Sequence, residues 1–245
     1  MFENIGEIAL LFWRTLLALP QVWRQRQKVF DQFFEIGNAS LLMVCVLSFF
    51  IGAVIALQTG PILVERSLAS AVGGVVGISI AKELAPIMMS ILIAGRIGSA
   101  MAAEIGSMRV YQEIDALRTM NINPIHYLVL PRLVAIAVAL PLLVTFSILI
   151  GWFGGAVVAD VNNHITIPFQ AFFADLRSIV LTKDVANGVF KSFCFALVIG
   201  VVSCHQGLTT IGGPRGIGRS VTKAVVNSIV LIVILDYVLT RFLLQ

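Results

Sequence analysis

Long runs of residues that are apolar on every side of a helix dominate the chain. Five of them are long enough to cross a bilayer, which takes about twenty helical residues. They cover approximately residues 36–57, 71–95, 127–158, 189–205 with their flanks, and 225–244. Helices that are apolar all round are either buried or face lipid. The pattern therefore predicts an all-α integral membrane protein with five transmembrane helices.

A further apolar run precedes the first span and differs from it in kind. Residues 8–19 are too few to cross a bilayer and are interrupted by Arg14. Tryptophans and basic residues accompany the run, which is typical of a helix that lies in the membrane interface. We expect a single membrane domain over residues 1–245, with an interfacial elbow region in residues 1–35 and a transmembrane core in residues 36–245.

The composition agrees with a membrane protein and argues against several functions. Hydrophobic residues make up 58% of the chain and charged residues only 12%, whereas about a quarter of a soluble domain is charged. The basic residues are scattered, so no nucleic-acid partner is expected. The three cysteines and three histidines lack metal-ligand spacing. We therefore expect no metal site, and no constellation of nucleophile and base suggests catalysis on this chain.

Lys and Arg residues are distributed unevenly between the two sides of this topology. If the N-terminus is cytoplasmic, most of them fall on the cytoplasmic side, including Arg24, Arg118 and Arg219. Cytoplasmic segments of membrane proteins carry an excess of these residues. The bias predicts a cytoplasmic N-terminus and a C-terminus on the opposite side.

The sequence AKELAP, residues 81–86, places two charges inside the second span. Lys82 lies about 16 Å along that helix, near the bilayer midplane, where a charge is costly unless it is paired or wet. Pro86 donates no hydrogen bond to the carbonyl of Lys82, so a kink is expected there. Two interpretations remain open: Lys82 and Glu83 neutralise each other at a helix bend, or both face a ligand in a polar cavity.

The segment between the second and third spans, residues 107–124, predicts a short amphipathic helix. Its apolar stripe consists of Val110, Ile114 and Leu117. Two pairs of opposite charge stand at helical spacing on its other faces, Arg109 with Glu113 and Asp115 with Arg118. The helix either rests on the membrane or docks into a partner. Charges of both signs favour a protein partner over anionic lipid.

Small residues are frequent just before this segment. Some of them stand at spacings, such as that of Gly95, Ser99 and Ala103, that let helices approach closely in lipid; the whole set is Gly95, Gly98, Ser99, Ala100, Ala102 and Ala103. We expect close packing on this face, either within the chain or against a second copy of it.

The stretch IGGPRGIGRS, residues 211–220, differs from a phosphate-binding loop only in having Arg219 where that motif has lysine. It stands in an expected loop of about twenty residues between two spans, and no parallel sheet is available to hold it. Nucleotide binding is therefore not expected here. The glycines and Pro214 are expected to form a turn, and Ser220 to cap the last span.

Four stretches resemble the MlaE (YrbE-type) permease family of ATP-binding-cassette lipid transporters. They are KELAP at 82–86, AGRIGSAMAAEIGSMRVYQEIDAL at 94–117, GGPRGIGRSVTKAVVNS at 212–228 and LDYVLT at 235–240. They occur in the family's order, and the interfacial helix with five spans is also similar to that family.

The resemblance implies an assembly in the bacterial inner membrane, with the N-terminus cytoplasmic and the C-terminus periplasmic. Two copies of the permease would bind a cytoplasmic ABC ATPase dimer, and a ring of MCE-domain proteins would sit on the periplasmic side. A small accessory subunit would bind the ATPase. ATP and Mg would belong to the ATPase, so no cofactor is expected on this chain.

The resemblance also implies roles for residues. Residues 107–120 would form the cytoplasmic coupling helix that contacts the ATPase, and the contact residues would be Arg109, Glu113, Asp115 and Arg118. Lys82 and Glu83 would line the cavity that holds a phospholipid, with Gln58 a weaker candidate. Many family members have arginine at the position of Lys82, which keeps the charge but changes its geometry.

The function implied is transport rather than catalysis: a permease subunit that moves phospholipids between the inner and outer membranes. The alternative is a secondary, ion-coupled transporter that uses Lys82 and Glu83 as a titrating pair. The two differ in whether an ATPase binds the chain stably.

Overall fold

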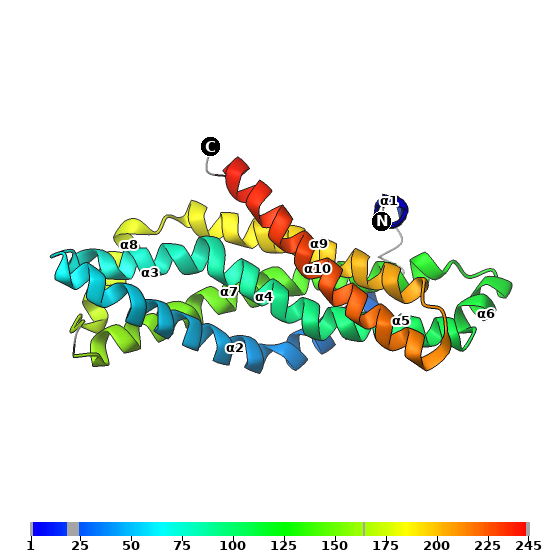
Figure 1. Ribbon diagram of the computed structural model, residues 1–245, viewed down its shortest axis with the longest axis horizontal. Helices are drawn as coiled ribbons and strands as arrows, with labels where there is room; N and C mark the ends of the chain where they lie inside the picture. The colour runs from blue at the N-terminus through cyan, green and yellow to red at the C-terminus, as the bar shows by residue number, and fades with distance from the viewer. Residues whose placement is uncertain (1, 19–24, 164, 244–245) are drawn as a thin grey trace. The chain divides into compact units, whose positions relative to one another are not determined.

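The computed structural model describes residues 2–18, 25–163 and 165–243, and it contains helices and no strand in that part of the chain (Figure 1). The α-helices are α1 (Phe2–Leu17), α2 (Arg26–Glu65), α3 (Val72–Ser79), α4 (Ala85–Ile93), α5 (Ser99–Val110), α6 (Glu113–Thr119), α7 (Leu130–Val161), α8 (Phe169–Ile179), α9 (Thr182–Leu208) and α10 (Gly213–Leu243). A 3₁₀ turn, η2 (Ala69–Ala71), precedes α3. Three π-helical turns, η3 (Ile80–Leu84), η4 (Ala94–Gly98) and η5 (Ile125–Val129), join or begin longer helices.

Five helical stretches of the described chain are long and apolar enough to cross a membrane, which confirms the predicted all-α membrane fold. They are Arg26–Glu65, Ala69–Val110, Ile125–Val161, Thr182–Leu208 and Gly213–Leu243. The α1 helix is separate from them, as expected. It buries Leu11 and exposes Leu10, Trp13 and Leu17. Its position in the membrane interface stays a prediction.

The helices extend beyond the apolar runs, and the expected loop of about twenty residues before the last span is wrong. α9 ends at Leu208 and α10 begins at Gly213. Gly212 and Gly213 have φ angles of 97° and 69°, which only glycine adopts readily, so the chain reverses within a few residues. Pro214 follows in the first helical turn, where its fixed φ is favourable. Ser220 therefore lies inside α10 and does not cap it.

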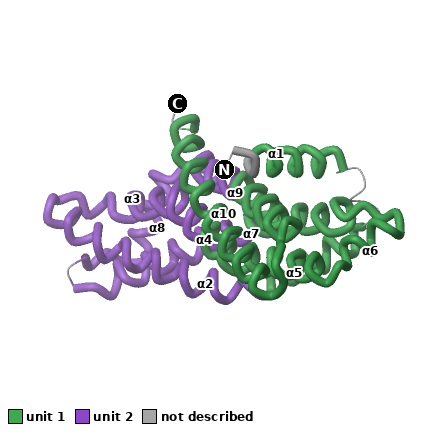
Figure 2. Tube along the Cα trace, turned by 45° about the vertical axis from the view of Figure 1, so that its right-hand side comes forward, with its two compact units in different colours: residues 1–38, 90–140, 193–245 green, residues 39–89, 141–192 purple. Residues whose placement is uncertain are grey.

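The chain forms two compact units, shown in separate colours in Figure 2. Unit 1 comprises residues 1–38, 90–140 and 193–245, and unit 2 comprises residues 39–89 and 141–192. A core of buried side chains brings α1, α5, α6, η5, α7 and α9 together within unit 1: Leu11, Ile105, Ile114, Leu128, Val129, Leu133, Val201 and Cys204.

Unit 2 is held by close contact between the backbones of α2 and α7. A Cβ atom at Gly52 would overlap the carbonyl group of Gly151, so both helices approach where glycine leaves room. The hydroxyl of Ser48 donates to the Val44 carbonyl, and its oxygen lies 2.7 Å from that of Ser147 across this contact. Small residues allow helices to pack closely in lipid, where van der Waals contact is the main attraction between them.

Candidate functional site

Lys82 and Glu83 lie on the π-helical turn η3, and each forms an ion pair with α9. Lys82 Nζ is 2.8 Å from Asp184 Oδ1, and Lys191 Nζ is 2.8 Å from Glu83 Oε2. The interpretation in which Lys82 and Glu83 neutralise each other is therefore wrong. Adjacent residues of a helix point in different directions, whereas a second helix offers each of them a partner. We call these four side chains the η3–α9 cluster.

The geometry of α9 explains how both pairs form at once. Asp184 and Lys191 are about two helical turns apart and so lie on one face of α9. Gly188 stands between them, and a Cβ atom there would overlap the carbonyl of Ala81. The absence of a side chain at Gly188 lets α9 lie directly against η3.

Lys191 also compensates for the proline. Because Pro86 has no N–H, it cannot donate to the carbonyl of Lys82 in the usual helical pattern. Lys191 Nζ donates to this carbonyl at 3.3 Å while it also donates to Glu83. Short π-helical turns often mark functional sites, and this one turns two charged side chains toward α9.

Burial differs across the η3–α9 cluster. The side chains of Lys191 and Asp184 are 3% and 8% exposed, whereas those of Lys82 and Glu83 are 29% and 38% exposed. Asp184 also accepts a hydrogen bond from the Leu181 N–H at 3.0 Å. The buried members hold the cluster in place. The more exposed members present one positive and one negative group to whatever lies beside η3.

Sequence reasoning missed Asp184 and Lys191. Asp184 precedes the expected fourth span, residues 189–205, and lies in the first turn of the longer helix α9. Lys191 stands within an apolar span, and a charge there is itself a signal of function or of a buried partner. Among the described residues, no hydrogen bond or ion pair joins Gln58 to the η3–α9 cluster. Gln58 lies on α2 with an exposed side chain.

The expected coupling segment folds as two helices instead of one. α5 ends at Val110, and Gln112 takes a left-handed conformation with φ of 60° before α6 begins. This break moves Glu113 away from helical register with Arg109, so the expected Arg109–Glu113 pair is wrong. Arg109 Nη1 instead lies 2.8 Å from Asp115 Oδ1. The expected pair of Asp115 with Arg118 is confirmed at 3.3 Å.

The apolar side of α6 is covered by the unit 1 core. Ile114 is fully buried in that core, and Leu117 packs against it. Tyr111, Glu113 and Arg118 remain exposed. The free surface of α6 therefore carries charged side chains, and the exposed Tyr111 lies just before it.

The close helix contact before and within α5 involves some of the expected small residues, Gly98 and Ala102, but not Gly95. Gly98 and Gly106 are buried, and a Cβ atom at either would lie 2.9 Å from a hydroxyl oxygen, that of Ser203 or of Thr210. Gly95, on the predicted face, is exposed and has nothing within 4 Å of a Cβ position. Packing within the chain thus occurs in a helical register other than that of Gly95. Contact with a second copy stays a prediction.

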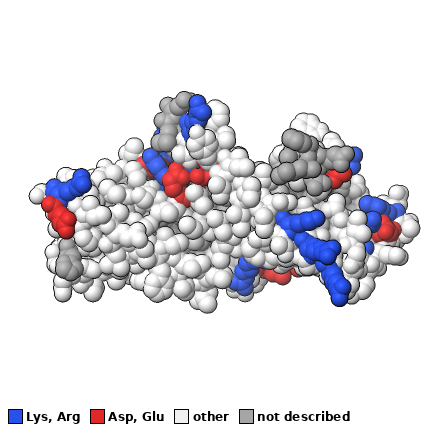
Figure 3. Space-filling model, in the orientation of Figure 1, with Lys and Arg blue, Asp and Glu red and all other residues white. Residues whose placement is uncertain are grey.

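The phosphate-loop-like stretch is helical from Gly213 onward. The stretch therefore begins a helix after a tight turn and is not a loop, and no parallel sheet lies in the described residues to hold it as one. Its basic residues Arg215, Arg219 and Lys223 recur at intervals of four and are exposed. Figure 3 shows Lys and Arg side chains gathered over this first part of α10. Among the described residues, no group of three His, Cys, Asp or Glu is placed to hold a metal.

Comparison with known proteins covers nearly the whole chain. The family model described as Permease MlaE matches residues 29–242. A probable ABC transporter permease protein of Synechocystis is 34% identical over 244 residues, covering 100% of this chain and 92% of that protein. A probable ABC transporter permease protein of Rickettsia prowazekii is 37% identical over 243 residues, covering 98% of this chain and 92% of that protein.

A plant protein is also similar. The Arabidopsis thaliana protein TRIGALACTOSYLDIACYLGLYCEROL 1, chloroplastic, is 35% identical over 223 residues. The match covers 91% of this chain and 62% of the plant protein.

Proposed function

The chain belongs to the MlaE permease family, and from this premise we propose that it is the membrane subunit of an ATP-binding-cassette transporter that moves phospholipids between the inner and outer membranes. The family indicates a transport subunit rather than an enzyme, and the five apolar helices indicate a multi-pass membrane protein. The name of the Arabidopsis relative contains that of a glycerolipid, which supports a lipid as cargo.

The observation that carries the proposal is the η3–α9 cluster. It combines two lysines with two carboxylates, so its charge is balanced, and it exposes part of Lys82 and Glu83. A phospholipid headgroup offers a phosphate, and in zwitterionic lipids an ammonium group. The phosphate would bind Lys82 and the cationic group would bind Glu83, with Gln58 as a further polar contact. The buried Asp184 and Lys191 would hold both groups in place.

The free surface of α6 is the proposed contact with the ATPase. Glu113, Asp115 and Arg118 of α6, with Arg109 at the end of α5, would form this contact, and charges of both signs favour a specific protein partner. ATP and Mg would be bound by the ATPase, and this chain would bind no cofactor. Movement of α6 would pass into the span that ends in α5 and contains η3.

The rest of the assembly follows from the same family. A second copy of the chain would complete the cavity, an ATPase dimer with a small accessory subunit would bind on the cytoplasmic side, and an MCE-domain ring would continue the lipid path. The chain would lie in the bacterial inner membrane, with its C-terminus periplasmic. The exposed basic residues at the start of α10 support a cytoplasmic position for that end of the helix.

Affinity purification of the full chain in mild detergent tests the proposal. The unsubstituted chain is expected to retain an ATPase, and Glu113→Lys with Asp115→Lys is expected to release it. Glu65→Lys, which reverses an exposed charge at the end of α2, serves as the matched control. A secondary transporter would move its cargo without any bound ATPase, so failure to recover one from the unsubstituted chain would overturn the proposal.

A further inference from the structure

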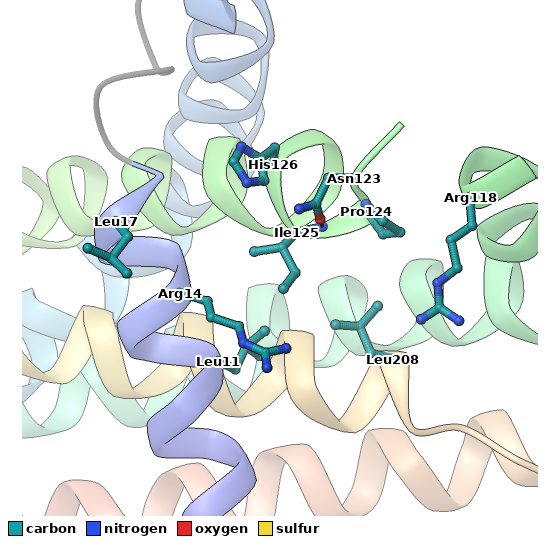
Figure 4. A pocket seen from close by; sticks show the side chains of 9 residues that line it. All are labelled: Leu11, Arg14, Leu17, Arg118, Asn123, Pro124, Ile125, His126 and Leu208. Carbon is teal, nitrogen blue, oxygen red and sulfur yellow. Dashed lines mark hydrogen bonds between the residues drawn. The ribbon is translucent and has the colours of Figure 1, made fainter. Parts of the chain in front are cut away.

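A second site lies in unit 1 and shares no residue with the η3–α9 cluster. It is a cavity of about 570 Å³ between α1, α6, η5 and the end of α9, which we call the α1–α6 cavity (Figure 4). Cavities of this size commonly hold small ligands or parts of larger ones. Its lining combines cationic and apolar side chains, and this combination identifies the class of ligand.

Two arginines supply the positive charge. Arg14 comes from the last turn of α1 and Arg118 from the last turn of α6, and Figure 4 shows their guanidinium groups on opposite sides of the cavity with Leu208 between them. Among the described residues that line the cavity, none is Asp or Glu. Asp115 lies near Arg118, but the same carboxylate oxygen also pairs with Arg109. One carboxylate shared by two arginines leaves a net positive charge, and Arg14 adds to it.

The apolar part of the lining continues onto the surface of α1. Leu11, Ile125 and Leu208 belong to the unit 1 core or pack against it, and all three line the cavity. Leu17 lines it as well and is 69% exposed. Trp13, one turn earlier on α1, is also exposed. In a membrane protein, an exposed apolar strip of this kind is suited to contact with acyl chains.

We propose that the α1–α6 cavity binds an anionic phospholipid of the surrounding membrane. Arg14 and Arg118 bind its anionic headgroup from the two sides of the cavity, since arginine binds phosphate through paired N–H donors, and the acyl chains leave along Leu17. Basic pockets beside membrane helices are a known means of recognising anionic headgroups. This lipid is a resident component and not the cargo, because it occupies a site separate from the η3–α9 cluster.

The bound lipid would connect α1 to α6 through its headgroup. Arg118 is also one of the residues proposed to contact the ATPase, so the lipid would fix the position of that part of α6. That the lipid is not the cargo rests on the proposed function, whereas binding of an anionic phospholipid in this cavity needs only the membrane location of the chain.

Site-specific photo-crosslinking tests the inference in the complete complex. A photoreactive residue replaces Leu17, and a control replaces Phe242, which is similarly exposed at 71%. The complex is placed in vesicles made of equal parts phosphatidylethanolamine and phosphatidylglycerol. Two cations in the headgroup site should enrich phosphatidylglycerol adducts at position 17 on the order of tenfold over position 242.

Substitutions of Arg14 and Arg118 provide the second part of the experiment. Arg14→Gln and Arg118→Gln should reduce the enrichment toward that of position 242, Arg14→Lys should retain part of it, and Arg66→Gln should leave it unchanged. Native mass spectrometry of chains without the photoreactive residue should show the same order in retained phosphatidylglycerol, with phosphatidylethanolamine unaffected. Equal lipid composition at the two positions, or an adduct to a protein chain instead of a lipid, would overturn the inference.

Discussion

Lys191 Nζ donates a hydrogen bond to the backbone carbonyl of Lys82, the carbonyl to which Pro86 cannot donate. The same ammonium group forms the ion pair with Glu83. A single buried side chain thus stabilises an irregular backbone turn and orients a charged residue on it. The irregular turn and the charged residues of the second span are therefore one structural feature.

Replacing Lys191 with methionine should destabilise unit 2. The substitution removes the lysine partner of Glu83 and the donor to the Lys82 carbonyl. Breaking a buried pair costs about 3–5 kcal/mol, and because Glu83 is partly exposed we expect about 2 kcal/mol. Thermal unfolding in detergent measures the effect. Lys183→Met, which removes an exposed lysine of the same helix, should change the unfolding temperature little; an equal change in both variants contradicts the assignment.

Gly188→Ala should separate α9 from η3. The added methyl group would overlap the Ala81 carbonyl, and this is backbone, which cannot rotate away. Overpacking of this kind costs about 1–3 kcal/mol. Gly218→Ala is the matched control, since a Cβ atom there meets nothing within 4 Å and alanine favours a helix. The prediction fails if both variants have the stability of the unsubstituted chain.

Two substitutions of Lys82 should show whether phospholipid transport depends on the positive charge at this position or on the shape of the lysine side chain. Lys82→Met removes the ammonium group proposed to bind phosphate, and we expect phospholipid transport to fall roughly tenfold, as for loss of a charged hydrogen bond. Lys82→Arg keeps the charge and should retain most activity. ATPase binding should be the same in both. Full transport by Lys82→Met would exclude Lys82 from the lipid site.

Asp115→Asn should have a small effect on the stability of the chain and a larger effect on the binding of α6 to the ATPase. Asp115 is half exposed, so loss of its pairs with Arg109 and Arg118 should cost less than about 1 kcal/mol of stability. Affinity for the ATPase should fall more, on the order of tenfold, because the two arginines lose the acceptor that orients them. Titration of the purified ATPase against the variant measures this. Unchanged affinity would place the ATPase contact elsewhere on the chain.

The sequence was sufficient for the spans because apolar runs of bilayer length leave a helix few alternatives. The sequence was insufficient to predict where the helices end, because polar residues can also continue a helix. Residues 213–220 look like a loop, yet they form the first turns of α10. Ion pairs were predictable only where both residues share a regular helix, as for Asp115 and Arg118. The observed pair of Arg109 with Asp115 could not be predicted, because it depends on the left-handed conformation of Gln112 between α5 and α6.

The ion-pair partners of Lys82 and Glu83 could not be predicted from the sequence for a related reason. Asp184 is about a hundred residues away along the chain, and its proximity to Lys82 depends on how α9 packs against η3. Gly188 makes that packing possible, but a single glycine in an apolar span does not reveal which backbone will approach it. The charges within the second span nevertheless indicated the part of the chain in which the η3–α9 cluster lies.

The most direct test of the central claim is ATP-driven phospholipid transfer by the reconstituted assembly. Vesicles that contain the complete complex and a labelled phospholipid are mixed with acceptor vesicles, and transfer is followed with ATP, without ATP and with the Lys82→Met variant. The account predicts transfer that requires ATP and the ATPase and that falls roughly tenfold in the variant. Equal transfer without the ATPase, or no phospholipid transfer by the complete complex, would contradict it.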